Sequence, residues 1–248
     1  MKKLLFLTLF LFCISTMFTI TLDDVIKAID EYLSQNKIEI AEITSETSFK
    51  IKLLIQEFND KFFSFDKTEA YNTLNKIEQL LDGSTVKYKE YVFNINAIYY
   101  YKAQTIPWIQ EKEEAIQEVS DYVLNKVSSK YDQVVILREL LKSIGKGNID
   151  PNQVPNFNEL LKLYFVLIDY YVHNDPDKFL QDPYVTYFII YGSQTAVDKA
   201  LEPIVEISKN VGSELTDVQK QLILNEVLSK YSDNDLAVEI YYNLTKEK

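Results

Sequence analysis

The stretch that decides the fold is LLKLYFVLIDYYV, residues 160–172, in which eleven of the thirteen residues are apolar or aromatic. A helix that is apolar on every side has to be covered on several sides. Thirteen residues are too few to cross a bilayer, which takes about 20, so the cover must come from protein. The sequence therefore predicts that this segment is the central helix of an all-α fold.

The composition indicates long helices joined by short turns, because the 248-residue chain has only 5 glycines and 6 prolines. Apolar residues recur at helical spacing along the chain, and they predict about ten helices in antiparallel hairpins. The expected helices cover 21–33, 40–62 or only 48–62, 66–81, 88–101, 107–127, 132–144, 160–172, 184–191, 216–228 and 233–244, and a further helix begins at Ser193 and includes Pro203. Residues 37–40 and 185–191 could form short strands instead.

Several residues mark where these helices begin and end. Asp66 and Thr216 are expected to cap helices, and Gly83 and Gly145 are expected to end them. Pro203 lies within a helical pattern and should kink or interrupt its helix.

The N-terminus has the layout of a secretory signal peptide. Lys2 and Lys3 precede an eleven-residue apolar run from Leu4 to Ile14, and a small polar stretch follows as far as Thr19. We therefore expect a signal peptide over 1–19, and a single helical domain over 20–248 with a possible sub-lobe boundary at 145–155. A lipid anchor on Cys13 and a buried N-terminal helix are the alternatives.

Stacked helical hairpins are the geometry of an α-solenoid, and tetratricopeptide repeats are the natural comparison. The Trp-Leu-Gly-Tyr consensus positions of that repeat do not recur here at a 34-residue step. The sequence thus predicts an α-solenoid-like, TPR-like array without membership of that family.

The charge balance argues against nucleic-acid binding. The formal net charge is -11, and Arg138 is the only arginine. Nucleic-acid binding depends on clustered basic residues, which are absent from this sequence. We expect contact with a membrane only through an uncleaved N-terminal segment.

Few residues could carry catalysis. The single cysteine lies in the signal-like segment, and the single histidine is His173. Asp169 and His173 are spaced i, i+4 and could share a helix face in a metal or ligand site. A simpler interpretation is that His173 interacts with the helix C-terminus and that Asp169 has a structural partner. The sequence indicates no cofactor, no metal and no enzyme.

Aromatic residues give the other lead, because 18 tyrosines and 14 phenylalanines are many for a core of this size. Tyr99, Tyr100, Tyr101 and Tyr170 are candidates for a surface that binds a partner, together with Asp169 and His173. The alternative is that these rings fill the core.

These observations favour an exported, non-catalytic helical protein, periplasmic or extracellular, that binds a protein or peptide partner. Two alternatives stay open. One is a small-ligand-binding protein or hydrolase with a pocket around Asp169 and His173, and the other is a structural component of the cell envelope.

Overall fold

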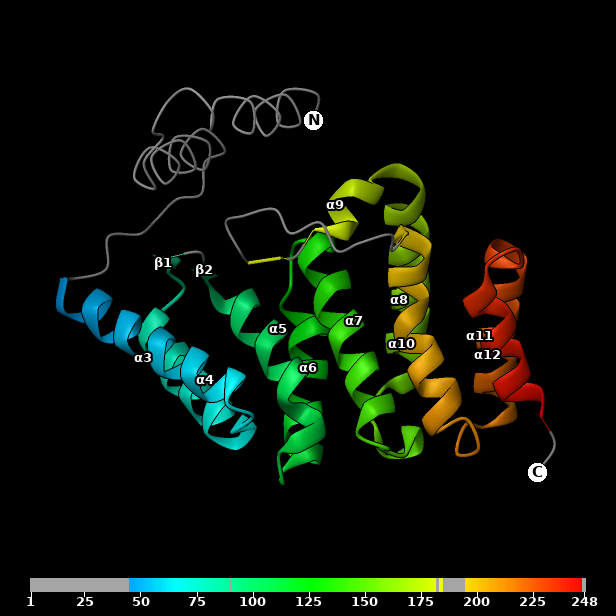
Figure 1. The fold of residues 1–248 in the computed structure, drawn as a ribbon, viewed down its shortest axis with the longest axis horizontal. Helices are drawn as coiled ribbons and strands as arrows, with labels where there is room; N and C mark the ends of the chain where they lie inside the picture. Colours follow the sequence, from blue (N-terminus) through cyan, green and yellow to red (C-terminus); the bar gives the residue numbers. More distant parts are fainter. Residues whose placement is uncertain (1–44, 90, 182, 185–194, 247–248) are drawn as a thin grey trace, which may run out of the picture. The chain divides into compact units, whose positions relative to one another are not determined.

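The computed structural model describes residues 45–89, 91–181, 183–184 and 195–246 (Figure 1). The described chain is mostly helical, which confirms the predicted class at that level, and it adds one two-stranded hairpin. Its α-helices and strands are α3 (Ser45–Phe63), α4 (Lys67–Leu81), β1 (Val86–Tyr88), β2 (Tyr91–Phe93), α5 (Ile95–Thr105), α6 (Lys112–Asn125), α7 (Lys130–Lys146), α8 (Phe157–Asn174), α9 (Pro176–Leu180), α10 (Ala196–Asn210), α11 (Asp217–Tyr231) and α12 (Asp235–Thr245). Two short 3-10 helices are η1 (Ile106–Trp108) and η2 (Pro151–Gln153).

Several expectations fall outside the described residues. They are the signal segment 1–19, the helix 21–33, the alternative strand at 37–40 and most of the segment 184–191. None of the helices in the described part is long and apolar enough to cross a membrane.

Most of the predicted helix ends agree with the structure. The Asp66 carboxylate accepts a hydrogen bond from the Glu69 amide, and Thr216 forms a complete capping box with Gln219. Gly83 follows α4 with a φ of +77°, a conformation that glycine adopts without strain. The predicted interruption at Pro203 is wrong, since α10 continues through this residue.

The predicted helix 88–101 is wrong in its first half, where the chain forms the β1–β2 hairpin. Val86 pairs with Phe93, and Tyr88 pairs with Tyr91. The tight turn places Tyr88 opposite Tyr91, and their spacing of three residues, continued by Val92 and Ile95, was mistaken for one helical stripe. Asn94 then caps α5 by accepting a hydrogen bond from the Ala97 amide.

The central helix is α7 and not the one predicted from 160–172. On α8, Val166 is 67% exposed and Tyr170 is 55% exposed, so one side of this apolar helix faces solvent. By contrast, α7 packs against α5, α6, α8, α10 and η1, and its residues are buried without interruption from Val134 to Leu141.

Two charged residues in the middle of α7 hid its position in the sequence. Arg138 and Glu139 are both buried, and the Arg138 Nε donates a hydrogen bond of 3.0 Å to the Glu139 carboxylate. The guanidinium also lies 5.6 Å from the centre of the Phe179 ring. Burial opposes the charge of Arg138, but the neighbouring Glu139, together with Tyr100 and Tyr164, outweighs this effect and raises the arginine pKa. Pairing thus allows a charged pair inside an otherwise apolar helix.

Gly145 lies inside α7, so the prediction that it ends the helix is wrong. A β-carbon at this position would lie 2.5 Å from the Glu206 carbonyl carbon and 2.7 Å from the Ile207 nitrogen of α10. Gly145 therefore permits a close approach of two helix backbones, and α7 and α10 are close neighbours in the described chain (Figure 1).

We predict that Gly145→Ala destabilises the protein by about 2 kcal/mol, because the added methyl group forces α7 and α10 apart. In a solvent-exposed helix the same change would stabilise the protein by about 1 kcal/mol, so the sign of the change in unfolding free energy distinguishes the two situations. Urea unfolding measures the effect, with the exposed Lys146→Ala as the control. A Gly145→Ala protein at least as stable as the wild type would contradict the close approach.

Candidate functional site

The predicted tyrosines at 99, 100 and 101 are all buried in the core around α5. The Tyr99 ring stacks on Tyr122 of α6, with the ring centres 3.6 Å apart, and Tyr101 stacks on Phe93 of β2 at 5.6 Å. Their rings therefore contribute to packing and not to the outer surface.

Tyr99 belongs to a polar cluster that the sequence analysis missed. We call it the Lys102 cluster, and it consists of Tyr71 and Glu78 from α4, Tyr99 and Lys102 from α5, and Glu118 from α6. The Lys102 ammonium donates to the Glu78 carboxylate at 2.5 Å and to the Glu118 carboxylate at 2.6 Å. The Tyr71 hydroxyl donates to Glu118 at 2.6 Å, and the Tyr99 hydroxyl donates to Glu78 at 3.0 Å.

The electrostatics of the cluster follow from one buried cation between two carboxylates. Burial alone would raise the pKa of Glu118, but hydrogen bonds from Lys102 and Tyr71 outweigh it and hold this pKa below its ordinary value. Burial, with the nearby carboxylates, raises the pKa of Tyr71 and of Tyr99 well above their usual range. Both tyrosines are therefore neutral hydrogen-bond donors at pH 7.

This arrangement suits a structural role better than a catalytic one. Lys102 is fully buried and its side-chain nitrogen is held by both carboxylates, so it is not placed to attack a substrate. The cluster instead joins α4, α5 and α6. The signal that could have revealed it was a lysine directly after three consecutive aromatic residues, because a charge in such surroundings needs partners.

The second predicted site, around Asp169, lies on the surface. The Asp169 carboxylate is partly exposed and lies 3.5 Å from His173 Nδ1 and 3.4 Å from Lys230 Nζ. Lys230 also pairs with Glu226, so these side chains form an ion-pair network that links α8 to α11. Tyr170, on the same helix, is exposed.

An open hollow of about 420 Å³ lies at the N-terminal end of α8, and it is lined by Pro151, Asn152, Val154, Asn156, Phe157, Asn158, Glu159 and Gln219. Asp169 is twelve residues beyond Phe157, which corresponds to about 18 Å along a helix. Within the described residues, no group of three or more His, Cys, Asp or Glu side chains could hold a metal ion.

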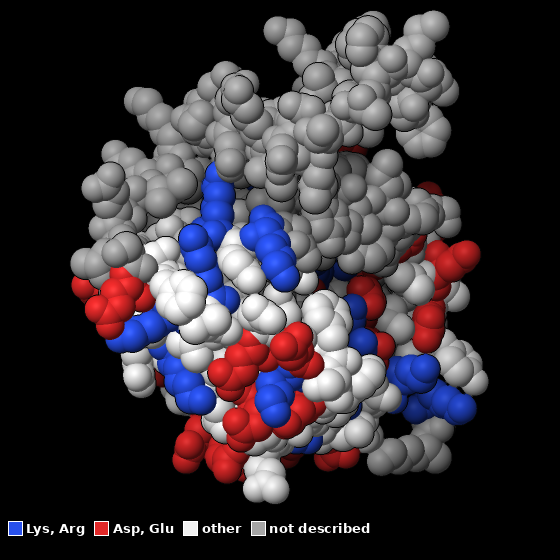
Figure 2. Space-filling model, turned by 60° about the vertical axis from the view of Figure 1, so that its left-hand side comes forward, with Lys and Arg blue, Asp and Glu red and all other residues white. Residues whose placement is uncertain are grey.

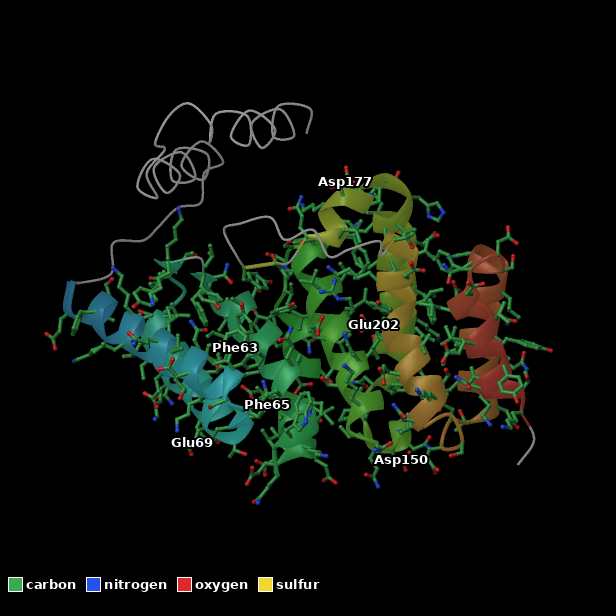
Figure 3. The ribbon with its side chains drawn as sticks, viewed as in Figure 1. Phe63, Phe65, Glu69, Asp150, Asp177 and Glu202 are labelled. Atoms are coloured by element: carbon green, nitrogen blue, oxygen red, sulfur yellow. The ribbon has the colours of Figure 1, made fainter. Side chains whose placement is uncertain are left out.

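Several strongly exposed aromatic residues lie at the turn between α3 and α4. We call this surface the aromatic patch, and it consists of Phe62, Phe63, Phe65 and Trp108. Phe63 is 67% exposed, Phe65 is 81% exposed and Trp108, from η1, is 56% exposed. Figure 3 shows Phe63 and Phe65 at the same end of the α3–α4 pair.

Three rings of the aromatic patch lie around the ammonium group of one lysine, Lys67. The Lys67 ammonium lies 3.3 Å from the centre of the Phe62 ring, 5.5 Å from that of Phe65 and 5.7 Å from that of Trp108. Rings from two distant parts of the sequence therefore surround a single cation. The sequence analysis missed this surface because Trp108 is more than 40 residues from the phenylalanines.

The backbone at Phe65 is strained, since its φ is +65° and it is not a glycine. A bulky residue in the left-handed region costs about 1 kcal/mol or more, and glycine or asparagine would occupy the position more easily. Here the strained residue is also the most exposed aromatic side chain of the described chain. Such a combination is typical of a residue kept for contact with a partner.

The face of the molecule over α3 and α4 carries no single sign of charge. Figure 2 shows basic and acidic side chains interspersed there, with uncharged residues between them. A mixed surface of this kind differs from the continuous basic face of a nucleic-acid-binding protein.

Comparison of the chain with protein-family models, with curated protein sequences and with solved structures gives no significant match.

For the Lys102 cluster, we predict that Glu118→Gln lowers the free energy of unfolding by about 1 kcal/mol at pH 7, since Glu118 is about one-third exposed and solvent screens its charge. The folded-state pKa of Glu118 lies below 4.5, so its stabilising effect is complete above the unfolded-state pKa and is lost as the pH falls through the folded-state value.

Urea unfolding of both proteins between pH 7 and pH 3 measures this difference, which should shrink towards zero at the acidic end. Glu239→Gln, on the exposed side of α12, is the control and should show little effect at any pH. A difference that stays constant with pH would show that Glu118 is not ionised within the cluster.

Proposed function

We propose that this chain is an exported, non-catalytic, helical-repeat-like protein that binds a protein or peptide partner outside the cytoplasm. The observation that carries the proposal is the aromatic patch at the α3–α4 turn. Aromatic residues are enriched among the side chains that dominate binding energy at protein interfaces. An exposed cluster of them is unusual on a surface that contacts only water.

The position of the aromatic patch supports this role. Trp108 is on η1, which packs directly against α7, and the phenylalanines belong to the α3–α4 pair, which packs on α5. The rings are thus presented by elements anchored in the core. A rigid anchor loses less conformational entropy when a partner binds than a flexible loop does.

The geometry of the polar residues favours a binding protein over an enzyme. Lys102 is engaged by two carboxylates, and Asp169 is engaged by Lys230 and His173. Neither group has the free, polarised partner that acid–base or nucleophilic catalysis requires. Export is supported by the basic and apolar pattern of residues 1–19 in the sequence.

A photo-crosslinking experiment tests the proposed function. We replace Trp108 with p-benzoylphenylalanine, irradiate the protein in envelope extract of its native host, and identify covalent adducts by mass spectrometry. We expect a discrete adduct that becomes weaker when Phe65→Gly is added, because glycine keeps the left-handed backbone but removes the ring.

The matched control carries the same photoreactive residue in place of Val166, which is 67% exposed on α8. An adduct pattern that is the same at 108 and at 166, or one that Phe65→Gly leaves unchanged, would exclude the aromatic patch as the binding surface.

A further inference from the structure

Lys67 differs from the other deeply buried lysine in lacking a counter-ion. Lys102 is fully buried and has two carboxylate partners. Lys67 is only 7% exposed, yet none of the carboxylates in the described part of the chain lies within ion-pair distance of its ammonium. The adjacent Asp66 pairs with Lys61 at 3.3 Å, and the nearby Glu69 accepts a hydrogen bond from Asn72, so neither carboxylate pairs with Lys67.

The hydrogen bonds of Lys67 are also incomplete. Its ammonium carries three donors, and one donates to the Phe62 carbonyl oxygen at 2.7 Å. Among the described residues, no acceptor is found for the other two. Burial lowers the pKa of Lys67, which reflects the cost of holding this cation away from water without a negative partner.

We propose that the aromatic patch binds a partner segment that brings a carboxylate to the Lys67 ammonium and an apolar side chain onto Phe65 and Trp108. This inference rests on the proposed function and adds the chemistry of the partner. The carboxylate is that of an acidic side chain, because the patch is an open surface that a partner segment can cross without ending there.

A carboxylate fits this site better than a second cation does. The faces of the surrounding rings already hold the Lys67 ammonium, and another positive group would be repelled by it. A carboxylate would accept the two remaining donors in charge-assisted hydrogen bonds, and the rings would shield those bonds from water. Phe65 is exposed and can change rotamer to admit the ligand.

The chain contains its own probe for this site, because Trp108 is the only tryptophan. We titrate the full-length protein with three synthetic peptides and follow the emission of Trp108. The peptides are N-acetyl-Leu-Phe with a free C-terminal carboxylate, N-acetyl-Leu-Phe-Glu-amide with a side-chain carboxylate, and N-acetyl-Leu-Phe-amide with neither. The third is the neutral reference.

We expect the peptide with the side-chain carboxylate to bind about tenfold more tightly than the neutral amide, which is the effect of a charge-assisted hydrogen bond in a partly solvated site. A preference for the peptide with the free C-terminus alone would overturn the assignment to an acidic side chain. Lys67→Met should abolish the preference, and Lys67→Arg should retain most of it.

The matched control is Lys61→Met. It also removes one positive charge close to the α3–α4 turn, but the lysine that it removes is paired with Asp66. It should leave the preference for the acidic peptide unchanged. Circular dichroism establishes that each variant is folded. Independently of any variant, carbodiimide coupling of the bound acidic peptide to the wild-type protein should place the new amide bond at Lys67.

The inference is overturned if the three peptides bind equally, if none changes the Trp108 emission, if Lys67→Met keeps the preference, or if the coupled peptide maps to other lysines. Its failure is distinguishable from failure of the proposed function. A photo-crosslinked partner that depends on Phe65 but not on Lys67 would support the aromatic patch as the binding surface and contradict only the proposed contact between a carboxylate and Lys67.

Discussion

The close packing of α7 against α10 is the constraint on which the rest of the described structure depends. Gly145 allows the two backbones to meet, and the paired charges of Arg138 and Glu139 allow α7 to be buried along its middle. The helices α5 and α8 pack against α7, α4 packs against α5, and α3 packs against α4. The aromatic patch is thus held in place through η1 and α5, whose positions α7 sets.

The sequence was sufficient for the helical class and for most helix ends, because caps such as Asp66 and Thr216 act within a few residues of the chain. It was insufficient to predict which helix is buried most deeply. The uniformly apolar segment 160–172 suggested the greatest burial, whereas the helix that is buried most, α7, carries two charged residues in its middle. The apolar content of a helix shows how much it can bury, and only its neighbours decide how much it does bury. The hairpin at 86–93 was missed because the spacing of Tyr88 and Tyr91 also fits a helical stripe.

For the polar groups of the candidate site, too, the sequence alone did not show which partners each side chain has. Lys102 and Lys67 both lie near aromatic residues in the sequence, yet one is neutralised by carboxylates from α4 and α6 and the other is surrounded by rings. These partners come from separate helices, so no local pattern distinguishes the two lysines. The tyrosines at 99–101 were correctly recognised as a cluster, but their position on an inner helix directs them into the core. The exposed Phe65 and Trp108 become a surface only when the chain has folded.

Hydrogen exchange followed by mass spectrometry tests most directly whether α7 is the centre of the structure. Amides that open only on global unfolding exchange most slowly, so the account predicts that peptides covering 134–144 are the slowest of the described chain. Peptides covering 160–172 should exchange faster, since one side of α8 meets solvent. Slower exchange in 160–172 than in 134–144 would contradict the account and return the central position to α8.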